Sequence, residues 1–421
     1  MGLNITEFTS LLKEHYTDAR VENMVYKDNP LHALLPKYED FGGKYLPVPI
    51  IYANPQGRSA DFSRAQARSL LTNTKSLSYL MTRVKDYSIA VIDTETLEAS
   101  KGDANAFMDA ATVEVDGAIN AATRSLAIAE YKSGWGEIGQ IKAATLVNST
   151  YLTLSNDDDV VNFEVGMELV VADTVSASNT RALGSSGNGL IITKVDRQAT
   201  SQHIKFAYNV NDATNGIPTI AAGDYIFVRG DRNALYASGK LKVTGLSGWI
   251  PTTAPTTGDS FFGVDRSADP TRLAGLRKDI SAYPIEEGLI LGANLVAREG
   301  GTLDHIFMNY TKFSELVNSL GSKVQYVDVK ITPEVGFRGV MINGKNGTIK
   351  VIPDQNCPSG YIYGLSINSW KLGSLGKAIR VIEPDGLQML RQSSADGVEL
   401  RYGFKGNMWT NAAGHNIVMT Y

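Results

Sequence analysis

One helical pattern, from Asp103 to Lys132, constrains the fold of this chain more than any other feature of its sequence. The stretch DANAFMDAATVEVDGAINAATRSLAIAEYK contains no proline and one glycine, and its apolar side chains recur every three or four residues. This spacing predicts one face of a long α-helix, with Asp103 as the N-cap and Ser133-Gly134 as the stop. At 1.5 Å per residue the helix would be about 45 Å long. We expect an extended structure to lie along it, although an ordinary long core helix is the alternative.

The composition is that of a globular protein and argues against several classes of protein, among them nucleic-acid-binding, disulfide-bonded and membrane proteins. The 421 residues are 43% hydrophobic and 20% charged, a length that predicts two or three domains. The formal net charge of −4 gives no general attraction to nucleic acid, so any contact with DNA should be local and weak. The single cysteine, Cys357, excludes an intramolecular disulfide. The sequence has no leader pattern and no apolar window long enough for a membrane span.

Residues 1–43 predict an apolar but irregular N-terminal arm. Asn29-Pro30 and Leu35-Pro36 interrupt any regular element in it. Such a segment needs a surface to lie on, either its own domain or a neighbour. Because so irregular a segment is not easily covered by its own chain, we expect that the free subunit leaves it uncovered until assembly. The apolar residues that should then be buried by a neighbour are Met24, Tyr26, Leu31, Leu34, Leu35 and Phe41.

Residues 44–92 predict two strands joined by a long polar connection. Pro47 and Pro49 cannot donate ladder hydrogen bonds, which indicates an edge ribbon. Between Asn54 and Lys85 six basic residues face one acidic residue, a net charge of +5, whereas the helical pattern of 103–132 has a net charge of −3. A solvated loop is the ordinary explanation, but an isolated ribbon is marginal in water. We therefore expect it to cross a neighbouring subunit, with Arg58, Arg64, Arg68 and Lys75 near Asp109, Glu114 and Asp116.

The remaining chain divides by composition. Residues 139–231 alternate short β-type runs with turn clusters, which predicts an inserted, small antiparallel β-barrel. Its acidic run, 157–159, lacks the glycine and downstream glutamate of a calcium loop, so a solvated turn is preferred. Residues 232–384 mix helices and strands, including a helix begun by Pro284 and a hairpin turn at 344–347. Residues 385–421 should return as strands beside the long helix.

No motif in the sequence predicts catalysis, cofactor binding or a metal site. The run Gly373 to Lys377 has the wrong spacing for a phosphate-binding loop. Asp304-His305 could form half of an acid–base pair, but a structural histidine at a strand end is the simpler interpretation. The five histidines lie singly and lack ligand spacing: His15, His32, His203, His305 and His415. We therefore expect a protein that is not an enzyme.

The order of these parts resembles the major capsid protein of tailed bacteriophages. Runs that look like that family include LLPKYEDFGGKYLPVPI, TRVKDYSIAVID, GSKVQYVDVK, IKVIPDQNCP and SADGVELRYGFKGN. The resemblance implies the α+β tailed-phage capsid fold. Its parts would be an N-arm (1–43), an E-loop (44–92), a P-domain (93–138 and 385–421) with spine helix 103–132, the β-barrel insertion (139–231), and an A-domain with part of the P-domain (232–384).

The same resemblance implies a function and a set of partners. The chain would assemble into hexamers and pentamers of an icosahedral shell that encloses double-stranded DNA, as part of the virion, after assembly in the cytoplasm of a bacterial host. Its partners would be copies of itself, a separate scaffolding protein, a portal protein at one vertex, a decoration or cement protein, and packaged DNA through weak non-specific contacts. An encapsulin-like compartment shell and a tail-tube protein are the alternatives. No membrane, cofactor or metal is implied.

Overall fold

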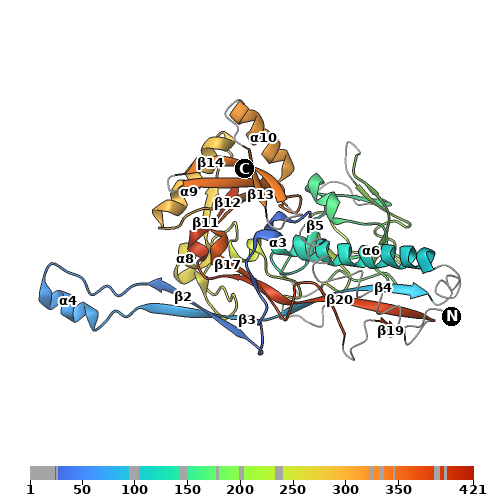
Figure 1. Ribbon diagram of the computed structural model, residues 1–421, viewed down its shortest axis with the longest axis horizontal. Helices are drawn as coiled ribbons and strands as arrows, with labels where there is room; N and C mark the ends of the chain where they lie inside the picture. The colour runs from blue at the N-terminus through green and yellow to red at the C-terminus, as the bar shows by residue number, and fades with distance from the viewer. Residues whose placement is uncertain are drawn as a thin grey trace.

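The computed structural model describes residue 24 and residues 27–93, 104–142, 149–176, 180–198, 203–232, 240–321, 326–330, 336–344, 347–383, 389–392 and 396–421. The molecule is elongated, and a two-stranded ribbon projects from one end (Figure 1). Helices and strands are mixed throughout, as the predicted α+β class requires. Within the described residues, no helix is both long enough and apolar enough to cross a membrane.

The predicted spine helix is confirmed as α6 (Ala104–Tyr131). It packs on two long antiparallel strands, β4 (Val84–Asp93) and β20 (Gly397–Thr410), whose register runs from Asp93 opposite Gly397 to Val84 opposite Gly406. Val115, Ile119 and Leu126 are buried on this side of the helix. The chain itself therefore provides the extended surface that so long a helix needs. The two strands that supply it lie far apart in sequence, from Asp93 paired with Gly397 to Val84 paired with Gly406.

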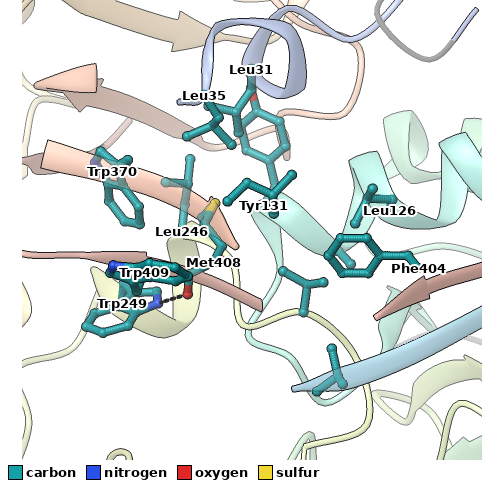
Figure 2. Close-up of a cluster of buried hydrophobic side chains, with 14 of the residues drawn as sticks. Leu31, Leu35, Leu126, Tyr131, Leu246, Trp249, Trp370, Phe404, Met408 and Trp409 are labelled. Carbon is teal, nitrogen blue, oxygen red and sulfur yellow. Dashed lines mark hydrogen bonds between the residues drawn. The ribbon is translucent and has the colours of Figure 1, made fainter. Parts of the chain in front are cut away.

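The sheet beneath α6 also joins the two ends of the chain. β1 (Lys37–Tyr38) runs parallel to β17 (Trp370–Ser374), and β17 is antiparallel to β20. β18 (Arg380–Val381) and β19 (Met389–Arg391) pair with the same edge of β20. α3 (Pro30–Leu34) and α7 (Leu246–Trp249) close the core that Figure 2 shows. In that core the Trp249 indole donates to the carbonyl of Met408 at 2.9 Å.

A second, seven-stranded sheet has the order β11-β21-β16-β12-β15-β14-β13 and mixes parallel and antiparallel pairs. Its strands are β11 (Leu276–Asp279), β12 (His305–Met308), β13 (Tyr326–Lys330), β14 (Gly336–Gly344), β15 (Gly347–Pro353), β16 (Tyr361–Leu365) and β21 (Ile417–Thr420). The helices of this region are α8 (Pro270–Ala274), α9 (Ile285–Arg298) and α10 (Tyr310–Leu320). The predicted helix after Pro284 and the hairpin at Gly344–Gly347 are confirmed.

The inserted region is a six-stranded antiparallel sheet with its own hydrophobic core. Its strands, in the order β5-β10-β7-β8-β9-β6, are β5 (Glu137–Gln140), β10 (Tyr225–Val228), β7 (Glu168–Ala172), β8 (Leu190–Asp196), β9 (His203–Phe206) and β6 (Tyr151–Thr153). An antiparallel bridge between Ile141 and Leu154 links the ends of the two edge strands and closes the sheet. The acidic run begins the 3₁₀ helix η2 (Asp157–Asn162). Among the described residues no group of three potential metal ligands occurs.

The ribbon consists of β2 (Leu46–Ala53) and β3 (Lys75–Met81), paired from Leu46 opposite Met81 to Ala53 opposite Lys75. The connection between them is not only a polar loop, because it contains the helix α4 (Phe62–Ser69). Other short 3₁₀ helices in the described ranges are η4 (Arg266–Ala268), η6 (Ile367–Ser369) and η7 (Ala413–His415).

The expectation that the free subunit leaves its N-terminal arm uncovered is wrong for the part of the arm nearest the body. Leu31, Leu35 and Phe41 are only 1%, 2% and 0% exposed in the single chain. Figure 2 places Leu31 and Leu35 against Tyr131. Hydrophobic burial within the subunit is available here because α3 fits between the C-terminal end of α6 and the two sheets.

Candidate intersubunit surfaces

The tip of the ribbon is the most exposed apolar surface of the described chain. Phe62, Leu70 and Leu71 are 81%, 81% and 84% exposed, and no residue of α4 is buried. Ile51 at the end of β2 is also exposed. Large apolar side chains this exposed, gathered on one projecting segment, usually mark an interaction site. The tip therefore needs a surface outside its own chain.

Local contacts give the tip its shape without help from the body. The Asp61 carboxylate caps α4 by accepting from the Ser63 backbone N–H at 3.0 Å. The Thr72 hydroxyl donates to the Arg68 carbonyl at 2.8 Å, which ties the end of the helix to the returning strand. A Cβ on Gly57 would lie 2.7 Å from the Ser69 Cβ, so this close crossing requires glycine.

Four predicted contact residues surround this apolar tip. Arg58, Arg64, Arg68 and Lys75 are all exposed. Arg64 lies 3.8 Å from Asp61, a pair that is open to solvent at both ends. An exposed pair of this kind contributes about 0–1 kcal/mol. The sequence therefore located the basic residues of this surface but not the apolar side chains that lie among them, because the polar composition of 54–75 concealed the helix.

The base of the ribbon, in contrast, is anchored to the body. Tyr79 is fully buried, its hydroxyl donates to the carbonyl of Leu273 at 3.0 Å, and its ring meets Trp249 edge-on with centroids 5.1 Å apart. Burial raises the pKa of Tyr79, so this phenol stays a neutral donor. The backbone N–H of Leu80 donates to Phe262 at 3.0 Å. The ribbon thus has an exposed tip and a buried, hydrogen-bonded base, an arrangement that allows the tip to contact another molecule.

The predicted acidic side of the spine helix is only partly available to a neighbour. Glu114 is exposed and Asp116 is half-buried, whereas the side chain of Asp109 lies outside the described residues. Glu130, which contributes to the net charge of −3, is buried against His32 of its own chain. Arg124 pairs with Glu164 of the inserted region. The helix therefore presents fewer acidic groups to solvent than its sequence indicates.

The predicted contact residues of the arm also differ in how far their own subunit buries them. Leu35 is covered by its own subunit, so the structure gives it a role in the core and not in an interface. Met24 and Leu34 are half-buried and pack against that core. Tyr26 lies outside the described residues.

A second exposed apolar surface was not identified from the sequence. Tyr87, Ile89 and Val91 of β4 all point away from α6 and are 53%, 52% and 43% exposed. Their alternation with the buried Ala90 and Ile92 is visible in the run YSIAVI, but period two alone does not tell which face is covered. This stripe lies on the face of the sheet opposite the spine helix.

A cavity of about 390 Å³ separates the spine helix from the inserted region. Its lining is mainly apolar and includes Ile128, Val165 and Met167. At its edge the buried Lys242 ammonium lies 2.9 Å from Asp86 and 3.1 Å from Asp231, so one cation links three parts of the fold. Burial raises the pKa of Asp231 to about 6, and Lys242 opposes that rise.

The Asp304-His305 pair has the properties of a structural histidine. Neither ring nitrogen of His305 has a hydrogen-bond partner among the described residues. Burial lowers the pKa of His305 to about 4, so the ring is neutral at pH 7. Burial likewise raises the pKa of the Cys357 thiol, which disfavours a reactive thiolate.

No protein-family model matches the sequence, and no curated protein matches it. Solved structures do match over most of the chain. The capsid asymmetric unit of cyanophage A-1(L) has a TM-score of 0.43 and 11% identity, covering 93% of this chain and 92% of that one. A structure of Mycobacterium phage Bobi has a TM-score of 0.38 and 10% identity, covering 100% and 99%. The holo-SrpI encapsulin complex of Synechococcus elongatus has a TM-score of 0.41 and 7% identity, covering 93% and 87%.

Proposed function

We propose that this chain is the major capsid protein of a tailed bacteriophage, which assembles into hexamers and pentamers of an icosahedral shell around double-stranded DNA. One observation carries the proposal: the ribbon has a buried, aromatic base and a tip whose Phe62, Leu70 and Leu71 are more than 80% exposed. A monomer gains nothing from such a projection. A neighbouring copy of the chain would bury it.

The geometry of the ribbon favours closed rings of subunits. A projection that docks on a different surface of the next copy makes a heterologous contact, and such contacts form a ring when the rotation between copies closes. Fully burying one large apolar side chain contributes about 1.5–3 kcal/mol before the cost of association. Three such side chains at every contact would contribute about 4.5–9 kcal/mol, which offsets much of that cost and is repeated around the ring.

Charge would guide this contact more than hold it. Arg58, Arg64 and Arg68 lie among the apolar tip residues, and Glu114 and Asp116 lie on the spine helix that we propose as part of the neighbour's receiving surface. Opposite charges accelerate encounter and select the register, whereas each exposed pair adds little affinity. The net formal charge of −4 leaves packaged DNA to weak local contacts.

The predicted division into N-arm, E-loop, P-domain, β-barrel insertion and A-domain belongs to this proposal. So do a separate scaffolding protein, a portal protein, a decoration or cement protein, and assembly in the bacterial cytoplasm into the virion capsid. These partners follow from the resemblance of the sequence to tailed-phage capsid proteins. The inserted region, with its own core, would face the outside of the shell.

Electron microscopy of the protein expressed in bacteria, with and without a scaffolding partner, tests the proposal. We expect closed particles from the unaltered chain and none from the variant Phe62→Ser/Leu70→Ser/Leu71→Ser. The matched control is Ile191→Ser/Tyr208→Ser, which changes exposed apolar residues of the inserted region and should leave particles intact. Open tubes would indicate a tail-tube protein, and particles filled with protein cargo an encapsulin-like shell. Particles that survive the triple change would contradict the role of the tip.

A further inference from the structure

The base of the N-terminal arm docks on a buried polar cluster that the proposed shell function does not require. His32 Nδ1 in α3 lies 2.5 Å from Glu130 Oε1 in α6, and both side chains are 1% exposed. The Lys37 ammonium donates to the His32 carbonyl. Polar groups are expensive to bury, so a cluster this deep must be matched closely to remain docked.

Asp354 joins the arm, the spine helix and the second sheet. It follows β15 and is 1% exposed. Its Oδ2 accepts from the Tyr131 hydroxyl at 2.8 Å and from the Leu31 backbone N–H at 3.4 Å. Its Oδ1 accepts from the Asn356 backbone N–H at 2.8 Å, and the Asn356 amide donates in turn to Asn29 Oδ1 at 2.9 Å. The carboxyl thus touches the arm directly and through one amide.

The two buried acids of this cluster are compensated differently. Glu130 has the His32 ring beside it, whereas among the described residues no cation pairs with Asp354, which receives only neutral donors. A carboxylate held this way keeps the cost of desolvation without an opposing charge. The titratable groups of the surrounding elements are Asp28, His32 and Lys37 of the arm, Glu130, Tyr131 and Lys132 of α6, Tyr310 of α10, Cys357, and Tyr363 of β16.

We propose that Asp354 is a proton-linked clasp for the arm: the segment from Asn29 to Leu35 binds the body more tightly when this carboxyl is protonated and loosens when it ionises. Burial, with a smaller contribution from Glu130, raises the pKa of Asp354 to about 6 from an ordinary 3.8. Hydrogen bonds from Asn356, Tyr131 and Leu31 oppose the rise. Departure of the arm would remove part of this burial, so docking takes up a proton.

The direction in which pH changes docking follows from the two pKa values of Asp354, about 6 when the arm is docked and 3.8 ordinarily. Because the docked carboxyl has the higher pKa, its contribution to docking is complete below about pH 4 and is lost as the pH rises through about 6. Between pH 8 and pH 5 the docking constant should rise about tenfold, if the released carboxyl regains its ordinary pKa.

Hydrogen exchange of the Leu31–Leu35 amides in the unassembled, full-length chain tests the clasp. The variant Asp354→Asn cannot ionise at this position, and the intrinsic exchange chemistry changes with pH equally in both proteins. The ratio of wild-type to variant exchange should therefore increase about tenfold from pH 5 to pH 8. Asp40→Asn is the matched control, because it neutralises an exposed carboxylate of the same arm and should retain the wild-type pH dependence.

A second variant keeps the test decisive if Asp354→Asn fails to fold. Tyr131→Phe keeps the ring and removes one donor that favours the ionised carboxyl, so release should move to higher pH. An unchanged midpoint in Tyr131→Phe would overturn the proposal. The same would follow from a wild-type ratio that is flat with pH, which would leave any pH dependence to His32 and Glu130. Because the measurement uses single subunits, the clasp and the shell function can fail separately.

Discussion

The base of the N-terminal arm and the tip of the ribbon are both extensions of the first ninety residues, yet the fold treats them in opposite ways. Leu35 in the arm is 2% exposed and Leu71 in the ribbon is 84% exposed. Leucine therefore has a different role in each segment. In the arm it stabilises the subunit, and in the ribbon it remains available to another molecule.

The contrast arises from what each extension meets within the chain. The arm meets Tyr131 at the end of α6 and Trp409 at the end of β20, which offer aromatic surface. Phe41 packs edge-on to Trp409 with ring centroids 5.8 Å apart. The ribbon contacts the body as far out as Tyr52, whose carbonyl accepts from the Arg272 guanidinium at 2.7 Å. Among the described residues, the tip from Gln56 to Thr72 forms hydrogen bonds only within the ribbon. Exposure, and not composition, separates an intersubunit surface from a core.

Breaking the buried pair at the arm should produce the largest effect on stability. In His32→Leu the Glu130 carboxylate stays buried without its partner, so we expect a loss of about 3–5 kcal/mol in the free energy of unfolding. The double variant His32→Leu/Glu130→Leu should recover most of that loss, since it removes both polar groups. Urea denaturation of the unassembled chain measures the free energy of unfolding of the single and the double variant. Equal loss in the single and double variants would contradict the pairing.

Truncating one leucine in each region is the most direct comparison. Leu35→Ala should destabilise the subunit by about 2–5 kcal/mol, because it leaves a cavity in a packed core. Leu71→Ala should change unfolding by no more than about 0.5 kcal/mol, because the side chain is in water. At a temperature where both variants are folded, Leu71→Ala should slow particle formation more than Leu35→Ala does. Light scattering during particle formation provides that second measurement.

Reversing charge at the tip should produce the smallest effect per residue. Arg58→Glu/Arg64→Glu/Arg68→Glu should leave a folded subunit that assembles slowly at low salt and recovers partly at high salt, because exposed charges are screened. Circular dichroism checks folding, and assembly rates at several salt concentrations check the interface. Normal assembly at low salt would remove these arginines from the contact. Shells that form but lose DNA would place them on the inner surface.

Local sequence determined much of the architecture. The three-and-four spacing of 103–132 was enough for α6, Pro47 and Pro49 were enough for an edge ribbon, and the turn clusters of 139–231 were enough for an inserted β-sheet. Each of these patterns acts within a few residues, so it is readable along the chain. The basic charge of the ribbon was equally readable, because net charge requires no knowledge of the fold.

Only the tertiary structure decided which apolar and charged residues are covered. Apolar spacing identifies the face of an element that prefers to be buried, but the surface that buries it comes from residues far away in sequence. His32 meets Glu130 across 98 positions, and Tyr131 meets Asp354 across 223. Glu130 is therefore buried within the subunit and does not contribute to the exposed acidic side of the spine helix. Leu35 is likewise buried and is not available for the proposed interface. At the tip of the ribbon, from Gln56 to Thr72, no such distant partner exists among the described residues, and for that physical reason Phe62, Leu70 and Leu71 remain in solvent.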